Sequence, residues 1–212
     1  MDSLEPVLLL GTQFAAFAGV ALLVIVTPGQ DTALTIRNSL LGGRRSGVLT
    51  AAGVCSGQCV WAVATSLGLA AVLIASEVVF AAMRLIGAAY LCFLGAQALY
   101  AALRGSRTKE LAAGRRRAAF RQGLLSNLGN PKMAVFFPSL LPQFGQSFEA
   151  LLALGFVFAC MTFVWLTAYA FAVARAGDVL RKPRVKRALD AVLGAMLVAF
   201  GIRLATASSG DR

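Results

Sequence analysis

The sequence predicts an all-α integral membrane protein with six transmembrane helices. Hydrophobic residues make up 58% of the 212 residues, whereas charged residues make up only 14%. A soluble domain contains about 45–50% apolar and about 25% charged residues, so one soluble core could not bury this many apolar side chains. These proportions exclude an ordinary cytosolic domain, a secreted disulfide scaffold and a disordered chain.

Six stretches with few or no charges mark the expected helices. Each is long enough to cross a hydrocarbon layer about 30 Å thick. Because signal peptides begin with basic residues and this chain begins with Asp2 and Glu5, we expect the first helix to be retained. In order, the stretches are residues 6–30, 46–76, 85–103, 122–148, 150–174 and 188–207.

The basic residues predict the orientation of these helices. The chain carries 20 Lys and Arg against 9 Asp and Glu, and 16 of the 20 basic residues lie in the first, third and fifth connections. The positive-inside rule then places both termini outside the cytoplasm. The third connection, residues 104–121, separates two three-helix halves, residues 1–103 and 122–212, which enter the membrane from opposite sides. Such inverted halves are common in secondary transporters.

The first expected helix ends in Thr27-Pro28-Gly29-Gln30-Asp31. Proline lacks an amide donor and glycine permits unusual backbone angles, so this segment predicts a helix break. Within a membrane, broken backbone is tolerated only against protein or a water-filled cavity. An acid and an amide after such a break could meet a polar solute or a proton. The alternative is that the helix ends at the cytoplasmic surface, with Asp31 in water.

A second break is expected at Asn127, Asn130, Pro131 and Lys132, inside the fourth stretch. A lysine near mid-membrane costs about 2.5–3.5 kcal/mol and usually faces a cavity or an acidic partner. We therefore expect Lys132 to form an ion pair with Asp31 across the two halves. The alternative is that Lys132 extends towards an interface with the headgroups.

The second expected helix offers Gln58, which could line a pathway or bond to a neighbouring helix. Gly53 and Gly57 form a GxxxG motif, which would join helices within the protomer or pair two protomers as a homodimer. Cys55 and Cys59 share a helix face, but the chain has no histidine, so we expect packing rather than a metal site or a thiol centre.

Several functional classes are disfavoured. The sequence has no phosphate-binding loop, no HExxH and no serine-centred hydrolase elbow, so we expect neither an enzyme nor a cofactor. The basic residues lie in short connections rather than on a polar domain, which argues against nucleic acid and, at residues 115–117, favours anionic lipid headgroups. Alternatives to a metabolite exporter are an exporter of metal or inorganic ions, a membrane thiol oxidoreductase and a non-transporting subunit.

Two segments resemble the signatures of the lysine-exporter family of amino-acid efflux proteins. The first is residues 27–39, followed by Gly42-Gly43-Arg44-Arg45-Ser46-Gly47. The second is residues 120–132, centred on Asn130-Pro131-Lys132 and followed by Phe136-Phe137 and Leu141-Pro142-Gln143-Phe144. The similarity extends over essentially the whole chain. The sequence departs from the family at Gln30, where a second proline is usual, which removes one backbone constraint and adds an amide.

The resemblance implies a six-span exporter in the bacterial inner membrane that moves amino acids or related metabolites at the expense of the proton gradient. Its expected partners are an amino-acid-like substrate, protons and lipid. Asp31 is the expected proton-linked or amine-binding acid, and Lys132 is expected to bind the substrate carboxylate or act as a counter-ion. The residues expected to bind substrate or couple protons are Thr27, Pro28, Gly29, Gln30, Asp31, Gln58, Asn127, Asn130, Pro131 and Lys132.

Overall fold

The computed structural model describes residues 5–68, 76–104, 112–176 and 183–206, and the regular structure in these ranges is entirely helical. The all-α prediction is therefore confirmed for the described residues. In chain order the elements are α1 (Glu5–Val26), α2 (Gln30–Ser66), α4 (Glu77–Arg104), α5 (Ala112–Leu128), α6 (Pro131–Val135), the π-helical turn η1 (Phe136–Leu140), the 3-10 turn η2 (Leu141–Gln143), α7 (Phe148–Arg175) and α9 (Pro183–Thr206).

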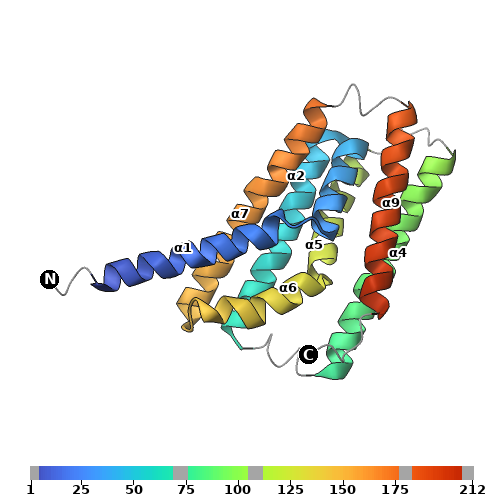
Figure 1. Cartoon of the computed structure of the whole chain (residues 1–212). Coiled ribbons are helices and arrows are strands. Elements are labelled where there is room, and N and C mark those ends of the chain that lie inside the picture. Colours follow the sequence, from blue (N-terminus) through green and yellow to red (C-terminus); the bar gives the residue numbers. More distant parts are fainter. Residues whose placement is uncertain (1–4, 69–75, 105–111, 177–182, 207–212) are drawn as a thin grey trace.

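The long helices form a bundle in which α2 packs against α5 and α7, while α4 packs against α9. Both sets of contacts join helices from the first half of the chain to helices from the second half. Helix α1 differs from the rest, because it projects outwards at a slant to the other long helices (Figure 1). Its C-terminal end lies at the centre of the bundle, where the chain enters α2.

Helix α2 is bent sharply at Gly43, whose backbone has φ +74° and ψ −175°. Glycine adopts this conformation without the steric penalty of a side chain. The segments on either side of the bend lie against each other, because the Asn38 Nδ2 atom donates to Thr50 Oγ1 at 2.9 Å. Residues 30–42 form a short helix, and most of it lies in the first connection between the expected membrane helices.

The fourth expected helix also differs from its prediction. Helix α5 begins at Ala112, so residues 112–121 of the expected basic connection are helical. Alanine and arginine both favour helices, which explains why the charges do not delay its start. The stretch 122–148 is then divided among α5, α6, η1 and η2, because Pro131 cannot donate the hydrogen bond that would continue α5.

One end of the bundle gathers the helix ends that adjoin the basic connections. Figure 1 places there the bend in α2, the C-terminal ends of α4 and α7, and the N-terminal ends of α5 and α9. Helices α2 and α7 are each long and apolar enough to cross a membrane. Shorter apolar helical segments are Gly11–Val26, Ala88–Gln97 and Ala191–Arg203. The six spans and their orientation stay predictions.

The GxxxG motif joins two helices of the same protomer. A Cβ atom added at Gly53 would overlap the carbonyl oxygen of Phe120 on α5, and one added at Gly57 would lie 2.8 Å from Asn127 Oδ1. These glycines allow α2 and α5 to approach closely, as small residues do between membrane helices. Because the motif is used within the protomer, it gives no support to the predicted homodimer.

A cluster of aromatic side chains fixes the C-terminal half of α1. Phe17 of α1 contacts Phe144 edge-on, with the ring centroids 5.6 Å apart. Phe136 stacks on Phe158 of α7 with centroids 4.4 Å apart, and both rings are buried. Such ring pairs add stability beyond the burial of apolar area. The cluster therefore packs α1, η1 and α7 together.

Candidate functional site between two interrupted helices

The first interruption separates α1 from α2. The Thr27 N–H still donates to the Leu23 carbonyl at 3.1 Å, and the Thr27 hydroxyl donates to the same oxygen at 2.6 Å. Pro28 then has no amide hydrogen to donate, and Gly29 is extended with φ −155° and ψ −170°. Helix α2 starts at Gln30. The carbonyl groups at the end of α1 are consequently left without helical partners.

The second interruption separates α5 from α6. Asn130 has extended backbone angles, φ −85° and ψ 112°, and caps α6: its Oδ1 atom accepts from the Lys132 N–H at 3.1 Å. Pro131 occupies the first turn of α6, where a missing amide hydrogen costs nothing. The sequence Asn-Pro-Lys thus ends one helix and starts the next.

The two interruptions meet at the carboxylate of Asp31. This carboxylate accepts hydrogen bonds from Ser126 Oγ at 3.2 Å, from Asn127 Nδ2 at 3.0 Å and from Asn130 Nδ2 at 3.0 Å. The Gln30 side-chain amide also donates to the Ser126 carbonyl. The side chains of Gln30 and Asp31 therefore form hydrogen bonds with residues around the second break, although the partners lie 95 to 99 residues apart in sequence.

Lys132 makes the reciprocal contact. Its Nζ atom donates to the Thr27 carbonyl at 3.1 Å, at the C-terminal end of α1. The ammonium therefore faces the negative end of one helix dipole, while Asp31 lies in the first turn of α2, at the positive end of another. The expected ion pair is not formed in this conformation: among the described residues, Asp31 and Lys132 each bind neutral groups of the opposite half.

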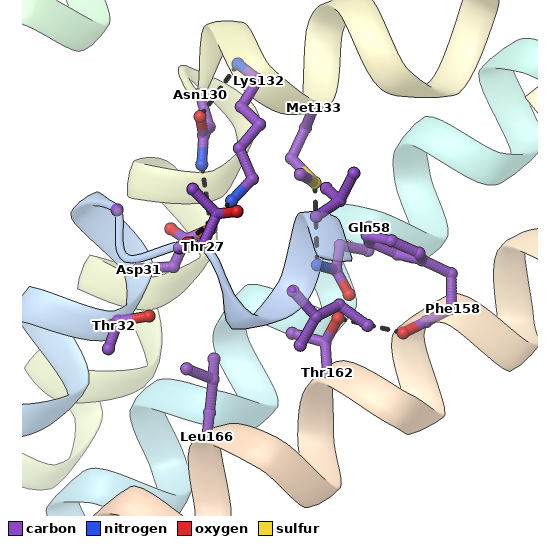
Figure 2. A pocket seen from close by; sticks show the side chains of 13 residues that line it. Thr27, Asp31, Thr32, Gln58, Asn130, Lys132, Met133, Phe158, Thr162 and Leu166 are labelled. Carbon is purple, nitrogen blue, oxygen red and sulfur yellow. Dashed lines mark hydrogen bonds between the residues drawn. The ribbon is translucent and has the colours of Figure 1, made fainter. Parts of the chain in front are cut away.

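A small cavity of about 30 Å³ lies beside these contacts (Figure 2). Figure 2 shows Asp31, Asn130 and Lys132 grouped at one side of it, with Gln58, Met133 and Thr162 at the other. Its remaining lining is Val24, Ile25, Thr27, Gly29, Thr32, Phe158 and Leu166. The cavity lining thus combines two charged residues with neutral polar and apolar side chains.

Gln58 is the cavity residue with the most incomplete hydrogen bonding. It is only 2% exposed, and its Oε1 atom has no hydrogen-bond partner. Its Nε2 atom has a weak acceptor, the Met133 sulfur at 3.7 Å. A buried polar atom without a partner destabilises a protein by about 1–3 kcal/mol, so its presence calls for an explanation.

Six of the ten residues singled out from the sequence line this cavity. They are Thr27, Gly29, Asp31, Gln58, Asn130 and Lys132. Gln30 and Asn127 lie next to it in the contact between the two breaks. Pro28 is exposed and Pro131 is partly buried, and neither lines the cavity. The two prolines break the helices, and the residues beside them supply polar side chains to the cavity.

Sequence reasoning missed Ser126 and Thr162. Ser126 is 2% exposed and precedes Asn130 by one helical turn, so helical spacing could have placed it on the same face. Thr162 is 5% exposed, lines the cavity and donates to the Phe158 carbonyl at 3.0 Å. It lies within a long apolar helix and has no local signal to distinguish it.

Comparison with known families gives a match to the LysE type translocator family over residues 22–208. The chain belongs to the LysE-type translocator family. This LysE-type translocator is therefore a membrane transporter and not an enzyme, which removes the thiol oxidoreductase alternative. Consistent with a packing role, Cys55 of α2 donates its S–H to the Ala159 carbonyl of α7 at 3.2 Å.

The similarity of this LysE-type translocator to individual relatives extends over nearly the whole length of each relative. It is 31% identical over 208 residues to a membrane protein of Pseudomonas aeruginosa, covering 93% of this chain and 96% of that protein. It is 28% identical over 201 residues to the membrane protein YrhP of Bacillus subtilis, covering 89% and 96%. It is 30% identical over 202 residues to the leucine efflux protein of Salmonella typhimurium, covering 89% and 92%. No solved structure matches it significantly.

The LysE-type translocator offers little to a metal ion. The described residues contain no group of three or more His, Cys, Asp or Glu side chains that could hold one. At the two breaks, the described polar side chains are one carboxylate, one ammonium, amides and hydroxyls. This donor set suits a small zwitterion better than a bound metal.

Proposed function

We propose that this LysE-type translocator exports amino acids, or closely related small metabolites, across the bacterial inner membrane and that protons drive the export. The observation that carries the proposal is the meeting of two interrupted helices at Asp31, beside a cavity lined by both polar and apolar side chains. Discontinuous helices of this kind form the substrate sites of many secondary transporters. The similarity to a leucine efflux protein supports an amino acid as the substrate.

The proposed topology has six spans in two inverted halves, residues 1–103 and 122–212, with both termini outside the cytoplasm. Its support is the gathering, at one end of the bundle, of the helix ends that adjoin the basic connections. The packing of α2 on α5 and of α4 on α9 also matches an arrangement in which the substrate path runs between the halves.

Lys132 is the proposed binding group for the substrate carboxylate. Its present acceptor, the Thr27 carbonyl, is neutral, whereas a carboxylate would add a direct attraction between opposite charges. A substrate carboxylate would therefore compete effectively for Lys132. By drawing Lys132 away, it would also release one of the contacts that join the two breaks.

Asp31 is the proposed proton site. As a carboxylate it only accepts hydrogen bonds, which matches the three donors that surround it. The Asn127 and Asn130 amides both donate to Asp31 Oδ2, so a proton bound at Oδ2 would oppose their N–H groups. Protonation would thus weaken the contact between the breaks and favour separation of the halves, which links proton binding to a conformational change.

The proposed transport cycle requires the cavity to widen. A cavity of about 150 Å³ holds benzene, whereas the cavity beside Asp31 has a volume of about 30 Å³. The cavity is therefore too small to hold an amino acid in this conformation. In the proposed cycle, substrate at Lys132 and a proton at Asp31 loosen the two contacts between the breaks, and one half then rocks against the other to expose the site on either side.

Release of metabolites from proteoliposomes tests this proposal. Vesicles containing the purified protein are loaded with an equal mixture of the common amino acids, a pH gradient is imposed, and the released amino acids are quantified by mass spectrometry. We expect selective release of one or a few amino acids, faster than from protein-free vesicles and slowed by a protonophore. Unselective or absent release would contradict amino-acid export, while selective release that ignores the protonophore would contradict proton coupling.

A further inference from the structure

The side-chain amide of Gln58 lies in the cavity lining and lacks the strong hydrogen-bond partners that it could bind. Its oxygen has no hydrogen-bond partner, and its nitrogen is bonded to a thioether sulfur, which is a weak acceptor. The side chain is 98% buried and belongs to the cavity lining. A glutamine in this state can offer both an acceptor and a donor to a molecule that enters the cavity.

Several other polar groups of the cavity already have hydrogen-bond partners. The Asp31 carboxylate accepts three hydrogen bonds from the second break. The Thr162 hydroxyl donates to Phe158, and the Thr27 carbonyl accepts from Lys132. An ammonium group needs acceptors, and among the amide and carboxylate oxygens of the described lining side chains Gln58 Oε1 is the buried one that lacks a donor.

We propose that Gln58 accepts the ammonium group of the substrate and that the cavity selects neutral amino acids with an apolar side chain. This inference rests on the proposed function. Lys132 would bind the carboxylate, so the two main-chain groups of the substrate lie between Lys132 and Gln58. The substrate side chain then packs against the apolar part of the lining.

The charges around the cavity support this selectivity. Its charged lining residues are Asp31 and Lys132, one of each sign, and Asp31 is occupied by the second break. A basic or acidic side chain on the substrate would instead meet Val24, Ile25, Met133, Phe158 and Leu166. Burying an unpaired charge among such groups carries a large desolvation penalty. Apolar side chains incur no such penalty and gain from burial.

Paired substrate analogues test the role of Gln58 directly. Leucine and 4-methyl-2-oxopentanoate share a carbon skeleton and a carboxylate, but only leucine carries an ammonium. Each is used to inhibit exchange of radiolabelled leucine by proteoliposomes containing wild type, Gln58→Met or Gln97→Met. Gln97→Met is the matched control, because Gln97 is exposed on α4.

In Gln58→Met we expect the half-inhibiting concentration of leucine to rise about 10- to 100-fold, the range expected for one hydrogen bond to a charged group. That of the keto acid should stay the same, and Gln97→Met should match wild type. The comparison of two inhibitors on one protein preparation is insensitive to the fraction that is folded. Gln58→Glu keeps an acceptor and should retain the preference for leucine, which covers the case in which Gln58→Met fails to fold.

Equal changes for both inhibitors, or no change for either, would overturn the assignment of Gln58. Equal inhibition of the wild type by leucine, lysine and glutamate would overturn the selectivity. These outcomes differ from failure of the proposed function, in which the wild type exchanges no amino acid.

Discussion

The Nδ2 atom of Asn130 donates to the Asp31 carboxylate at 3.0 Å across 99 residues of sequence. Through its other amide atom, Oδ1, the same side chain caps α6 at the Lys132 N–H. Asn130 therefore caps the helix that follows the second interruption and also bonds the second interruption to the first. The local geometry of each break and the contact between the breaks are consequently coupled.

Two substitutions separate the roles of Asn130. Asn130→Ala removes both the cap and the contact with Asp31, and we expect the free energy of unfolding to fall by about 2–4 kcal/mol. Asn130→Ser keeps a capping oxygen but is too short to retain the contact with Asp31, so we expect a loss smaller by about 1 kcal/mol. Denaturant unfolding of the purified protein measures both, alongside leucine exchange.

Ser147→Ala is the matched control for the loss of a helix cap. Ser147 caps α7 by accepting from the Ala150 N–H at 3.1 Å, far from the cavity lining. It should lower stability by about 1 kcal/mol and leave exchange unchanged. If Asn130→Ser exchanged leucine as rapidly as Ser147→Ala, the contact between Asn130 and Asp31 would have no part in transport.

Exchanging the charges of Asp31 and Lys132 should not restore function. The two residues bind neutral groups of opposite halves and not each other. In the double variant Asp31→Lys with Lys132→Asp, an ammonium would face the amide donors of the second break and a carboxylate would face the Thr27 carbonyl. We expect leucine exchange to stay as low as in the worse single variant. Exchange above that of both single variants would show that a direct ion pair matters.

The close crossing of α2 and α5 predicts that a larger side chain at Gly53 lowers the stability of the protein. A Cβ atom at Gly53 would overlap the Phe120 carbonyl, so Gly53→Ala should force the helices apart and lower the free energy of unfolding by about 1–3 kcal/mol. At Gly19 of α1 nothing lies within 4 Å, so Gly19→Ala should stabilise the helix by about 0.5–1 kcal/mol. Denaturant unfolding compares the two, and equal effects would argue against a close crossing at Gly53.

Local backbone chemistry explains what could be predicted from the sequence. Pro28 and Pro131 lack amide hydrogens wherever they lie, so both helix breaks could be placed without a structure. Composition likewise indicated helices within a membrane. The prediction that Asp31 and Lys132 act in transport followed from the cost of charge near such breaks, and both residues line the cavity.

Features that depend on packing could not be predicted in the same way. The sequence pattern ended the first expected helix at residue 30 and began the second at residue 46, but the chain between them is mostly helical and turns at Gly43, so that its two segments pack together. The partners of Asp31 proved to be neutral amides and a hydroxyl, because Asn127 and Asn130 lie nearer to it than a lysine that reaches the Thr27 carbonyl. The unpartnered oxygen of Gln58 is visible only once every neighbour is placed.

Leucine accumulation driven by a pH gradient tests the central claim most directly. Asp31→Asn keeps the size of the side chain but cannot ionise, and Glu149→Gln, at an exposed residue of α7, is the matched control. In proteoliposomes we expect wild type and Glu149→Gln to accumulate leucine against its concentration gradient, while Asp31→Asn only lets leucine equilibrate. Accumulation by Asp31→Asn to the wild-type level would contradict the claim that proton binding at Asp31 drives transport.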